Sequence, residues 1–222
     1  MKRIAIILAG GTSSRCGFDK LFIENPKGVP VIFQTLKIFQ NCENIDEIIL
    51  VLNSEKCEIL QKKYKNNFSK FSKIKKILPG GKERIFSLKN AINFCEKNYK
   101  KNCHIIVHNA ANANLCPKDL AQGIDFAKKK KNVIFGFFTP NSIKKVQKNI
   151  VVDFLDRSEI FETQTPQISD LETFKKSFLA FKKIKNNFFP KDEAELLNLI
   201  NEKIFIFECS EKNTKITFPS DL

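Results

Sequence analysis

A turn of two glycines near the N-terminus contains the first residues that could do chemistry. Gly10 and Gly11 follow an uninterrupted apolar run over residues 4–8, and the basic residues Arg15 and Lys20 come shortly after them. Glycines let a phosphate approach main-chain N–H groups, and cations balance the charge of a polyphosphate. Neither G-x-x-x-x-G-K-[ST] nor G-x-G-x-x-G is present. The segment predicts another kind of phosphate-binding turn, and the alternative is a tight turn without a ligand.

A second glycine turn and one polar motif lie further along the chain. Gly80-Gly81 leads into a predicted helix whose first turn contains Ser87. The hydroxyl and the N–H groups of that first turn are natural partners for a ribose, a base or a phosphate. Alternatively, this is a plain helix N-terminus. Thr163-Gln164-Thr165-Pro166-Gln167 is unusually polar for a loop, and the alternative is a simple strand exit.

Composition argues for a globular protein and against several functional classes. Of 222 residues 42% are hydrophobic, and the formal net charge is +14 at pH 7. Lys is spread along the whole chain, and its one dense run, residues 128–131, ends a predicted helix, where cations suit the helix dipole. An anionic small molecule therefore fits better than a nucleic acid. The seven Cys are scattered without C-x-x-C spacing, which argues against a disulfide framework and a zinc site.

We expect a cytoplasmic, reduced protein that does not bind membranes. The N-terminus lacks the pattern of a targeting leader, and no apolar run is long enough to span a bilayer.

The order of predicted elements indicates one α/β domain over residues 1–222. Strand and helix alternate with short links up to about residue 131, which is typical of a doubly wound, mostly parallel sheet with right-handed crossovers. We expect strands over residues 4–8, 45–52, 75–78, 104–107, 132–138 and 204–208, and helices over 31–39, 55–65, 84–97, 117–131, 170–183 and 192–201. Residues 20–23 read as a short extended piece, and Asn53-Ser54 as a cap for the helix that follows.

An inserted β-arm is expected at about residues 139–164. Two extended segments, 146–155 and 159–163, flank a predicted turn at Asp156-Arg157-Ser158. A hairpin that projects from a doubly wound domain is often an oligomer arm, so we expect a homodimer.

The motifs taken together resemble a known family. Residues 8–15 with Lys20 resemble the signature loop of the sugar- and polyol-phosphate nucleotidyltransferases. With Gln164-Thr165-Pro166-Gln167, and with N-x-K-[IV]-T and P-x-D-L at residues 213–217 and 219–222, the chain resembles the cytidylyltransferases that make CDP-methylerythritol. The relatives that act on ribitol 5-phosphate look nearly the same. The resemblance implies a nucleotide-diphospho-sugar transferase-like, Rossmann-like fold with a projecting arm.

The resemblance also implies roles for individual residues, with CTP and a polyol phosphate as substrates and Mg²⁺ or another divalent cation as cofactor. Arg15 and Lys20 would stabilise the transition state at the α-phosphate, and Arg157 and Lys215 would hold the acceptor's phosphate. The predicted substrate- and nucleotide-binding residues are Ala9, Gly10, Gly11, Gly81, Ser87, Asn109, Ser142 and Thr165. In this family the hairpin swaps across a dimer, so Arg157 and Ser142 would serve the partner's site.

The chain departs from the family where the metal would bind. The family's H-D-A-A-R-P loop reads His108-Asn109-Ala110-Ala111-Asn112-Ala113 here, so a metal-binding Asp and a substrate-facing Arg are both lost. An amide oxygen can ligate Mg²⁺ but does not neutralise its charge. Two alternatives therefore stand: Asn109 binds the metal in place of the family's Asp, or it does not bind it. Lys82 replaces an acidic residue, and we hypothesise that it supplies charge stabilisation.

The leading expectation is cytidylyl transfer to 2-C-methyl-D-erythritol 4-phosphate in the non-mevalonate isoprenoid pathway. Ribitol 5-phosphate as acceptor, or a nucleotide-binding relic without catalysis, are the alternatives. A basic nucleic-acid-binding domain is a more distant rival, because no recognised module is present.

Overall fold

The computed structural model describes residues 1–11, 19–99, 102–184 and 188–216. The predicted catalytic residue Arg15, the remainder of the first glycine loop and the terminal P-x-D-L motif lie outside the described residues.

The centre of the fold is a seven-stranded sheet in which only one strand runs against the others, which confirms the expected doubly wound, mostly parallel α/β architecture. Its order is β3-β2-β1-β4-β8-β5-β9, with β8 antiparallel to both of its neighbours. The strands are β1 (Lys2–Leu8), β2 (Glu47–Leu52), β3 (Ile74–Pro79), β4 (Cys103–Asn109), β5 (Val133–Phe138), β8 (Phe161–Asp170) and β9 (Phe205–Glu208).

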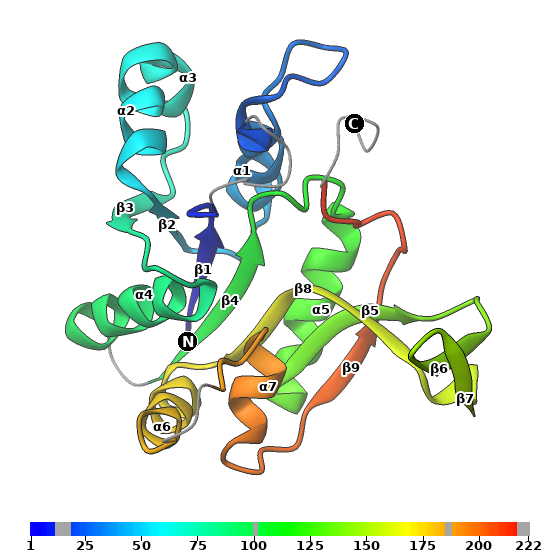
Figure 1. The fold of residues 1–222 in the computed structure, drawn as a ribbon. Coiled ribbons are helices and arrows are strands. Elements are labelled where there is room, and N and C mark those ends of the chain that lie inside the picture. The colour runs from blue at the N-terminus through cyan, green and yellow to red at the C-terminus, as the bar shows by residue number, and fades with distance from the viewer. Residues whose placement is uncertain (12–18, 100–101, 185–187, 217–222) are drawn as a thin grey trace.

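Helices cover both faces of this sheet (Figure 1). One buried cluster joins the sheet to α1 (Val31–Asn41), α2 (Ser54–Lys63) and α5 (Pro117–Lys130), and a second joins it to α4 (Arg84–Asn98), α6 (Leu171–Lys182) and α7 (Glu193–Asn198). The short α3 (Lys65–Phe68) follows α2. Successive β1 residues alternate between the clusters, as the two-residue period of a strand requires. No helix of the described residues is both long and apolar enough to cross a membrane.

The arm exists, but its turn is not where the sequence predicted it. β6 (Ile143–Gln147) pairs antiparallel with β7 (Ile150–Leu155) around Lys148 and Asn149, which both have positive φ. Positive φ at both central positions is the requirement of a type I′ hairpin turn. The predicted turn residues 156–158 instead precede and enter a 3-10 turn, η2 (Arg157–Glu159), that links β7 to β8. The prediction of one continuous extended segment over residues 146–155 was therefore wrong.

Two other local predictions were wrong. Lys20–Phe22 forms a 3-10 turn, η1, rather than an extended piece, because Asp19 Oδ1 accepts a hydrogen bond from the Leu21 N–H at 3.2 Å. Gln164-Thr165-Pro166-Gln167 is not a loop but the middle of β8, where the pairing with β5 shifts register and the Thr165–Pro166 peptide is cis. A bulge is one of the few places where a sheet accepts proline.

His108 is a fully buried titratable group at the end of β4. Its Nε2 donates a hydrogen bond to the Asn112 carbonyl oxygen at 2.9 Å, and its ring lies 4.9 Å from that of Phe39. Burial lowers the pKa of His108 to about 4 from its ordinary 6.5. The imidazole is therefore neutral at physiological pH.

We predict that this histidine makes the fold acid-sensitive. The unfolded chain binds a proton at His108 near pH 6.5 and the folded chain only near pH 4, so stability falls as the pH falls between these values. The difference corresponds to about 3 kcal/mol, since one pKa unit is worth ~1.4 kcal/mol. Urea unfolding at pH 7 and pH 4 measures this change in the free energy of unfolding, in wild type and in His108→Gln.

His104→Gln is a comparison variant and not a neutral one, because burial also lowers the pKa of His104, so this substitution should remove its own, separate part of the acid sensitivity. The same loss of stability on acidification in His108→Gln as in wild type would contradict the prediction.

Candidate functional site

The two predicted glycine turns lie side by side at one edge of the sheet. The Ala9 N–H donates to the Val51 carbonyl and the Gly80 N–H to the Leu52 carbonyl, each at 2.8 Å. These bonds continue the pairing of β2 with β1 on one side and with β3 on the other. A Cβ atom on Gly10 would lie 3.7 Å from the Gly80 Cα atom. Both turns therefore face the same space beyond the sheet.

Ser87 lies between the two turns. Its Oγ accepts a hydrogen bond from the Gly81 N–H at 3.0 Å and would lie 3.6 Å from a Cβ on Gly10. A Cβ on Gly81 would lie 2.5 Å from the Phe86 Cβ, which no real side chain tolerates. Gly81 is therefore required by the packing of the first turn of α4, whatever ligand it binds.

Asn109 and Thr165 also come together, at the end of β4. The Asn109 N–H donates to Thr165 Oγ1 at 3.4 Å, and Asn109 Nδ2 donates to Asn112 Oδ1 at 3.3 Å. The C-terminal motif reaches the same place: Asn112 Nδ2 donates to the Asn213 carbonyl at 2.9 Å, and Asn213 Nδ2 to the Thr165 carbonyl at 2.6 Å. Exposed Lys215 follows two residues later. Three motifs that are far apart in the sequence thus share one hydrogen-bond network.

Arg84 is a functional candidate that sequence reasoning used only as the start of a helix. It forms a two-pronged ion pair with the fully buried Glu193, at 2.6 and 3.0 Å, and its Nε donates to Asn109 Oδ1 at 3.1 Å. Burial disfavours the charged form, but Glu193 outweighs this and raises the pKa of Arg84. Only four Arg occur in this Lys-rich chain, and that scarcity is the signal that could have identified it.

The described side chains do not fit a protein-held divalent cation. The Asn109 side-chain oxygen, the atom that would replace a carboxylate ligand, already faces the Arg84 guanidinium at 3.1 Å. The described part of the chain has no group of three or more His, Cys, Asp or Glu residues that could hold a metal ion. A positive guanidinium at this oxygen opposes a second cation there.

Two further predicted residues, Arg157 and Ser142, do not join this cluster within one chain. Arg157 and Ser142 are exposed, and the arm projects from the sheet on the side opposite α4 (Figure 1). Arg157 Nη1 donates to the Pro140 carbonyl at 3.3 Å, and Ser142 Oγ accepts a hydrogen bond from Lys144. Lys20 is half-buried in η1, and Lys82, the hypothesised substitute for the lost carboxylate, is exposed.

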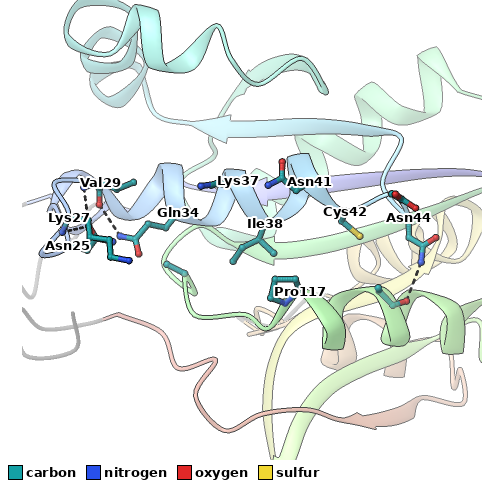
Figure 2. Close-up of a pocket in the computed structure, with 13 residues that line it drawn as sticks. Asn25, Lys27, Val29, Gln34, Lys37, Ile38, Asn41, Cys42, Asn44 and Pro117 are labelled. Atoms are coloured by element: carbon teal, nitrogen blue, oxygen red, sulfur yellow. Dashed lines mark hydrogen bonds between the residues drawn. The ribbon is translucent and has the colours of Figure 1, made fainter.

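A cavity of about 640 Å³ runs along α1 but contains none of the predicted site residues (Figure 2). Three of its polar side chains are already hydrogen-bonded to the backbone. Asn25 Oδ1 accepts from the Val29 N–H at 3.0 Å, Gln34 Nε2 donates to the Val29 carbonyl at 2.9 Å, and Asn44 Nδ2 donates to the Ala121 carbonyl at 3.4 Å. These side chains stabilise the walls of the groove. The glycine turns, not this groove, form the candidate site.

Comparison with known proteins gives one consistent family. The family model described as IspD, 2-C-methyl-D-erythritol 4-phosphate cytidylyltransferase, matches residues 3–222. Enzymes of that name from Clostridium perfringens strain SM101 and from Dictyoglomus thermophilum are 35% and 32% identical to the chain; both alignments cover 100% of it and 96% and 94% of the relatives.

Solved structures agree in fold. The 4-diphosphocytidyl-2C-methyl-D-erythritol synthase of Anaerococcus prevotii has a TM-score of 0.83 at 24% identity, over 99% of this chain and 92% of that one. The Francisella tularensis 2-C-methyl-D-erythritol 4-phosphate cytidylyltransferase has a TM-score of 0.78 at 26% identity, over 100% and 96%. The chain belongs to the IspD family of 2-C-methyl-D-erythritol 4-phosphate cytidylyltransferases.

Proposed function

We propose that this protein transfers the cytidylyl group of CTP to 2-C-methyl-D-erythritol 4-phosphate and releases pyrophosphate. The observation that carries the proposal is the family match over residues 3–222. The meeting of Gly10, Gly80 and Ser87 supports it, because two turns with backbone N–H groups suit the phosphates and ribose of a nucleotide. We place the reaction in the cytoplasm as part of the same proposal.

The chemistry is an in-line substitution at phosphorus. A phosphate oxygen of the acceptor forms a bond to the α-phosphorus of CTP while the bond from that phosphorus to the β-phosphate oxygen breaks, and pyrophosphate leaves with the electron pair. No covalent enzyme intermediate is needed, so the protein contributes positioning and charge stabilisation. In this proposal Arg15 and Lys20 stabilise the transition state at the α-phosphate, and Arg157 and Lys215 hold the acceptor's phosphate.

A homodimer completes the site in this proposal. Arg157 and Ser142 lie on the arm, away from the glycine turns of their own chain, so a partner's arm would have to supply them. The arm carries a large exposed apolar surface formed by Val146, Ile150, Val151, Val152, Phe154 and Leu155, with Phe154 74% exposed. Exposed apolar side chains gathered on one projecting hairpin are typical of a protein–protein interface.

We propose that a divalent cation accompanies the phosphates of CTP and is not held by Asn109. Mg²⁺ keeps several waters and is commonly bound through substrate phosphates. The pairing of Asn109 with Arg84 favours this arrangement over a protein ligand. Asn109 stands where the family has a metal-binding Asp, and this loss of a carboxylate favours a second candidate function, a nucleotide-binding relic without catalysis. Ribitol 5-phosphate is the alternative acceptor.

An activity assay tests the proposed reaction directly. Purified protein with CTP, Mg²⁺ and methylerythritol phosphate should release pyrophosphate, and Lys20→Ala and Arg15→Ala should each lower kcat/KM by about 10²- to 10³-fold, because each removes a charge that stabilises the transition state. Lys62→Ala is the control, since Lys62 is exposed and forms an ion pair with Glu58 on its own helix. If pyrophosphate were released with ribitol 5-phosphate but not with methylerythritol phosphate, ribitol 5-phosphate would be the acceptor. If the protein bound CTP but released no pyrophosphate with either acceptor, the nucleotide-binding relic would be favoured.

A substitution on the arm tests the proposed dimer. Phe154→Asp should convert a dimer to a species of one chain mass, 25.5 kDa, in analytical ultracentrifugation. It should also lower kcat/KM at least ~10-fold, since Arg157 would no longer reach a partner's site. Leu179→Asp replaces a side chain that is 63% exposed on α6, outside the arm, and should leave both quantities unchanged. A fully active wild-type monomer would rule out the shared site.

Mn²⁺ binding tests the proposed place of the metal. Wild type should bind Mn²⁺, measured by electron paramagnetic resonance, only together with CTP, whereas Asn109→Asp should bind it about 10-fold more tightly because a carboxylate neutralises the cation. Asn98→Asp adds the same charge at an exposed position of α4 and should change nothing. Tight Mn²⁺ binding to wild type without nucleotide would contradict the assignment.

A further inference from the structure

Lys56 is a buried cation whose position neither the family motifs nor the proposed mechanism explains. It lies in the first turn of α2, and only 2% of the residue is exposed. Its backbone is fixed by the helix cap, since Asn53 Oδ1 accepts a hydrogen bond from the Lys56 N–H at 2.9 Å. Asn53 itself follows the end of β2 directly. The side chain therefore starts from a rigid point beside β1.

The ammonium group of Lys56 meets three acceptors, all on the segment that carries the first glycine turn. Its Nζ donates to the Gly11 carbonyl, to the Ala9 carbonyl at 3.3 Å, and lies 3.5 Å from Asp19 Oδ1. An ammonium has three N–H donors, so its hydrogen-bonding capacity is matched. Burial lowers the pKa of Lys56, and Asp19 opposes this. A buried ammonium with one carboxylate and two carbonyl partners would lose stability if any of these partners moved away, because its charge would be left uncompensated.

The bond to Ala9 has a consequence for the neighbouring amide. In a trans peptide the C=O and the N–H point in opposite directions. With the Ala9 carbonyl directed at Lys56, the N–H of Gly10 in the same peptide unit is directed away from it. Among the hydrogen bonds between described residues, none uses the Gly10 N–H. Lys56 thus orients a backbone donor in the candidate phosphate turn.

The bond to Asp19 has a second consequence, for Lys20. The same oxygen of Asp19, Oδ1, accepts a hydrogen bond from the Leu21 N–H at 3.2 Å, and the Asp19 carbonyl accepts one from the Phe22 N–H at 3.0 Å. These two bonds form η1, which contains Lys20. Lys56 therefore links the start of the glycine turn to the turn that carries a proposed catalytic lysine.

We propose that Lys56 is a positioning residue that holds the Gly10–Gly11 turn and the Lys20 turn in one geometry for the nucleotide's phosphates, acting through Ala9, Gly11 and Asp19. This inference rests on the proposed function for its kinetic consequences. Lys56 contacts the backbone of the turn, so its effect is on orientation, and reaction rates are sensitive to displacements as small as 1 Å.

The test is Lys56→Met, which keeps the length of the side chain and removes its charge. We expect kcat for pyrophosphate release to fall about 10- to 100-fold while KM for CTP changes less than about 3-fold. Lys62→Met changes the same residue type on the exposed side of α2 and should leave kcat unchanged. A lower melting temperature with unchanged kcat would reduce Lys56 to a structural anchor and overturn the proposal.

Asp19→Asn provides a second variant in case Lys56→Met does not fold, because it removes one of the three partners and leaves the two carbonyls. Its kcat should fall in the same direction by a smaller factor, and the double variant should be no worse than Lys56→Met alone, since the residues act as a unit. An unchanged kcat in Asp19→Asn, or fully additive losses in the double variant, would contradict the linkage.

Amide hydrogen exchange separates this inference from the proposed reaction. In Lys56→Met or Asp19→Asn the amides of Ala9, Leu21 and Phe22 should exchange at least ~10-fold faster than in wild type and in Lys62→Met. If wild type releases no pyrophosphate, the proposed function fails while these rates still report the positioning. Unchanged exchange at all three amides would reject the positioning role whether or not the enzyme is active.

Discussion

The parallel register of β1 with its two neighbours is the constraint on which the site depends. Leu8 lies opposite Val51 of β2 and opposite Asn109 of β4. Because the three strands run in the same direction and end together, Ala9, the Asn53 cap and the end of β4 emerge at one edge of the sheet. A slip of one residue would exchange the two buried faces of β1, which belong to different hydrophobic clusters. Core packing therefore specifies the geometry of the glycine turn.

Two cations, the partly exposed Arg84 and the buried Lys56, then fix the loops at this edge. Each is held by one carboxylate and by neutral oxygens. Arg84 has Glu193 and the Asn109 amide oxygen, and Lys56 has Asp19 and two backbone carbonyls. With Asn109 in place of a carboxylate, Arg84 keeps its hydrogen bond but loses a second negative charge. The edge is consequently more positive than a carboxylate would make it, which suits a triphosphate and disfavours a free metal ion.

The sequence was sufficient to predict an element where one local pattern determines its structure. Continuous apolar runs gave the central strands, and Asn53 does cap α2 as expected. It was insufficient where the controlling interaction is local but uses unusual residues, as in the Lys148-Asn149 turn, which lacks the glycine that normally signals positive φ. It was also insufficient where the partner is distant: Glu193 lies 109 residues beyond Arg84, and no periodicity relates them.

Lys56 illustrates why composition hides such residues. It is one of 38 Lys and Arg residues in a chain with a net charge of +14, and nothing in its sequence neighbourhood separates it from the solvated lysines. Exposed charges are screened by water and salt and contribute little to a specific geometry. A lysine that has lost its water must instead align with fixed oxygens, so its partners are positioned as strictly as it is. In this chain burial, rather than the abundance of positive charge, distinguishes Lys56 from the lysines that only cover the surface.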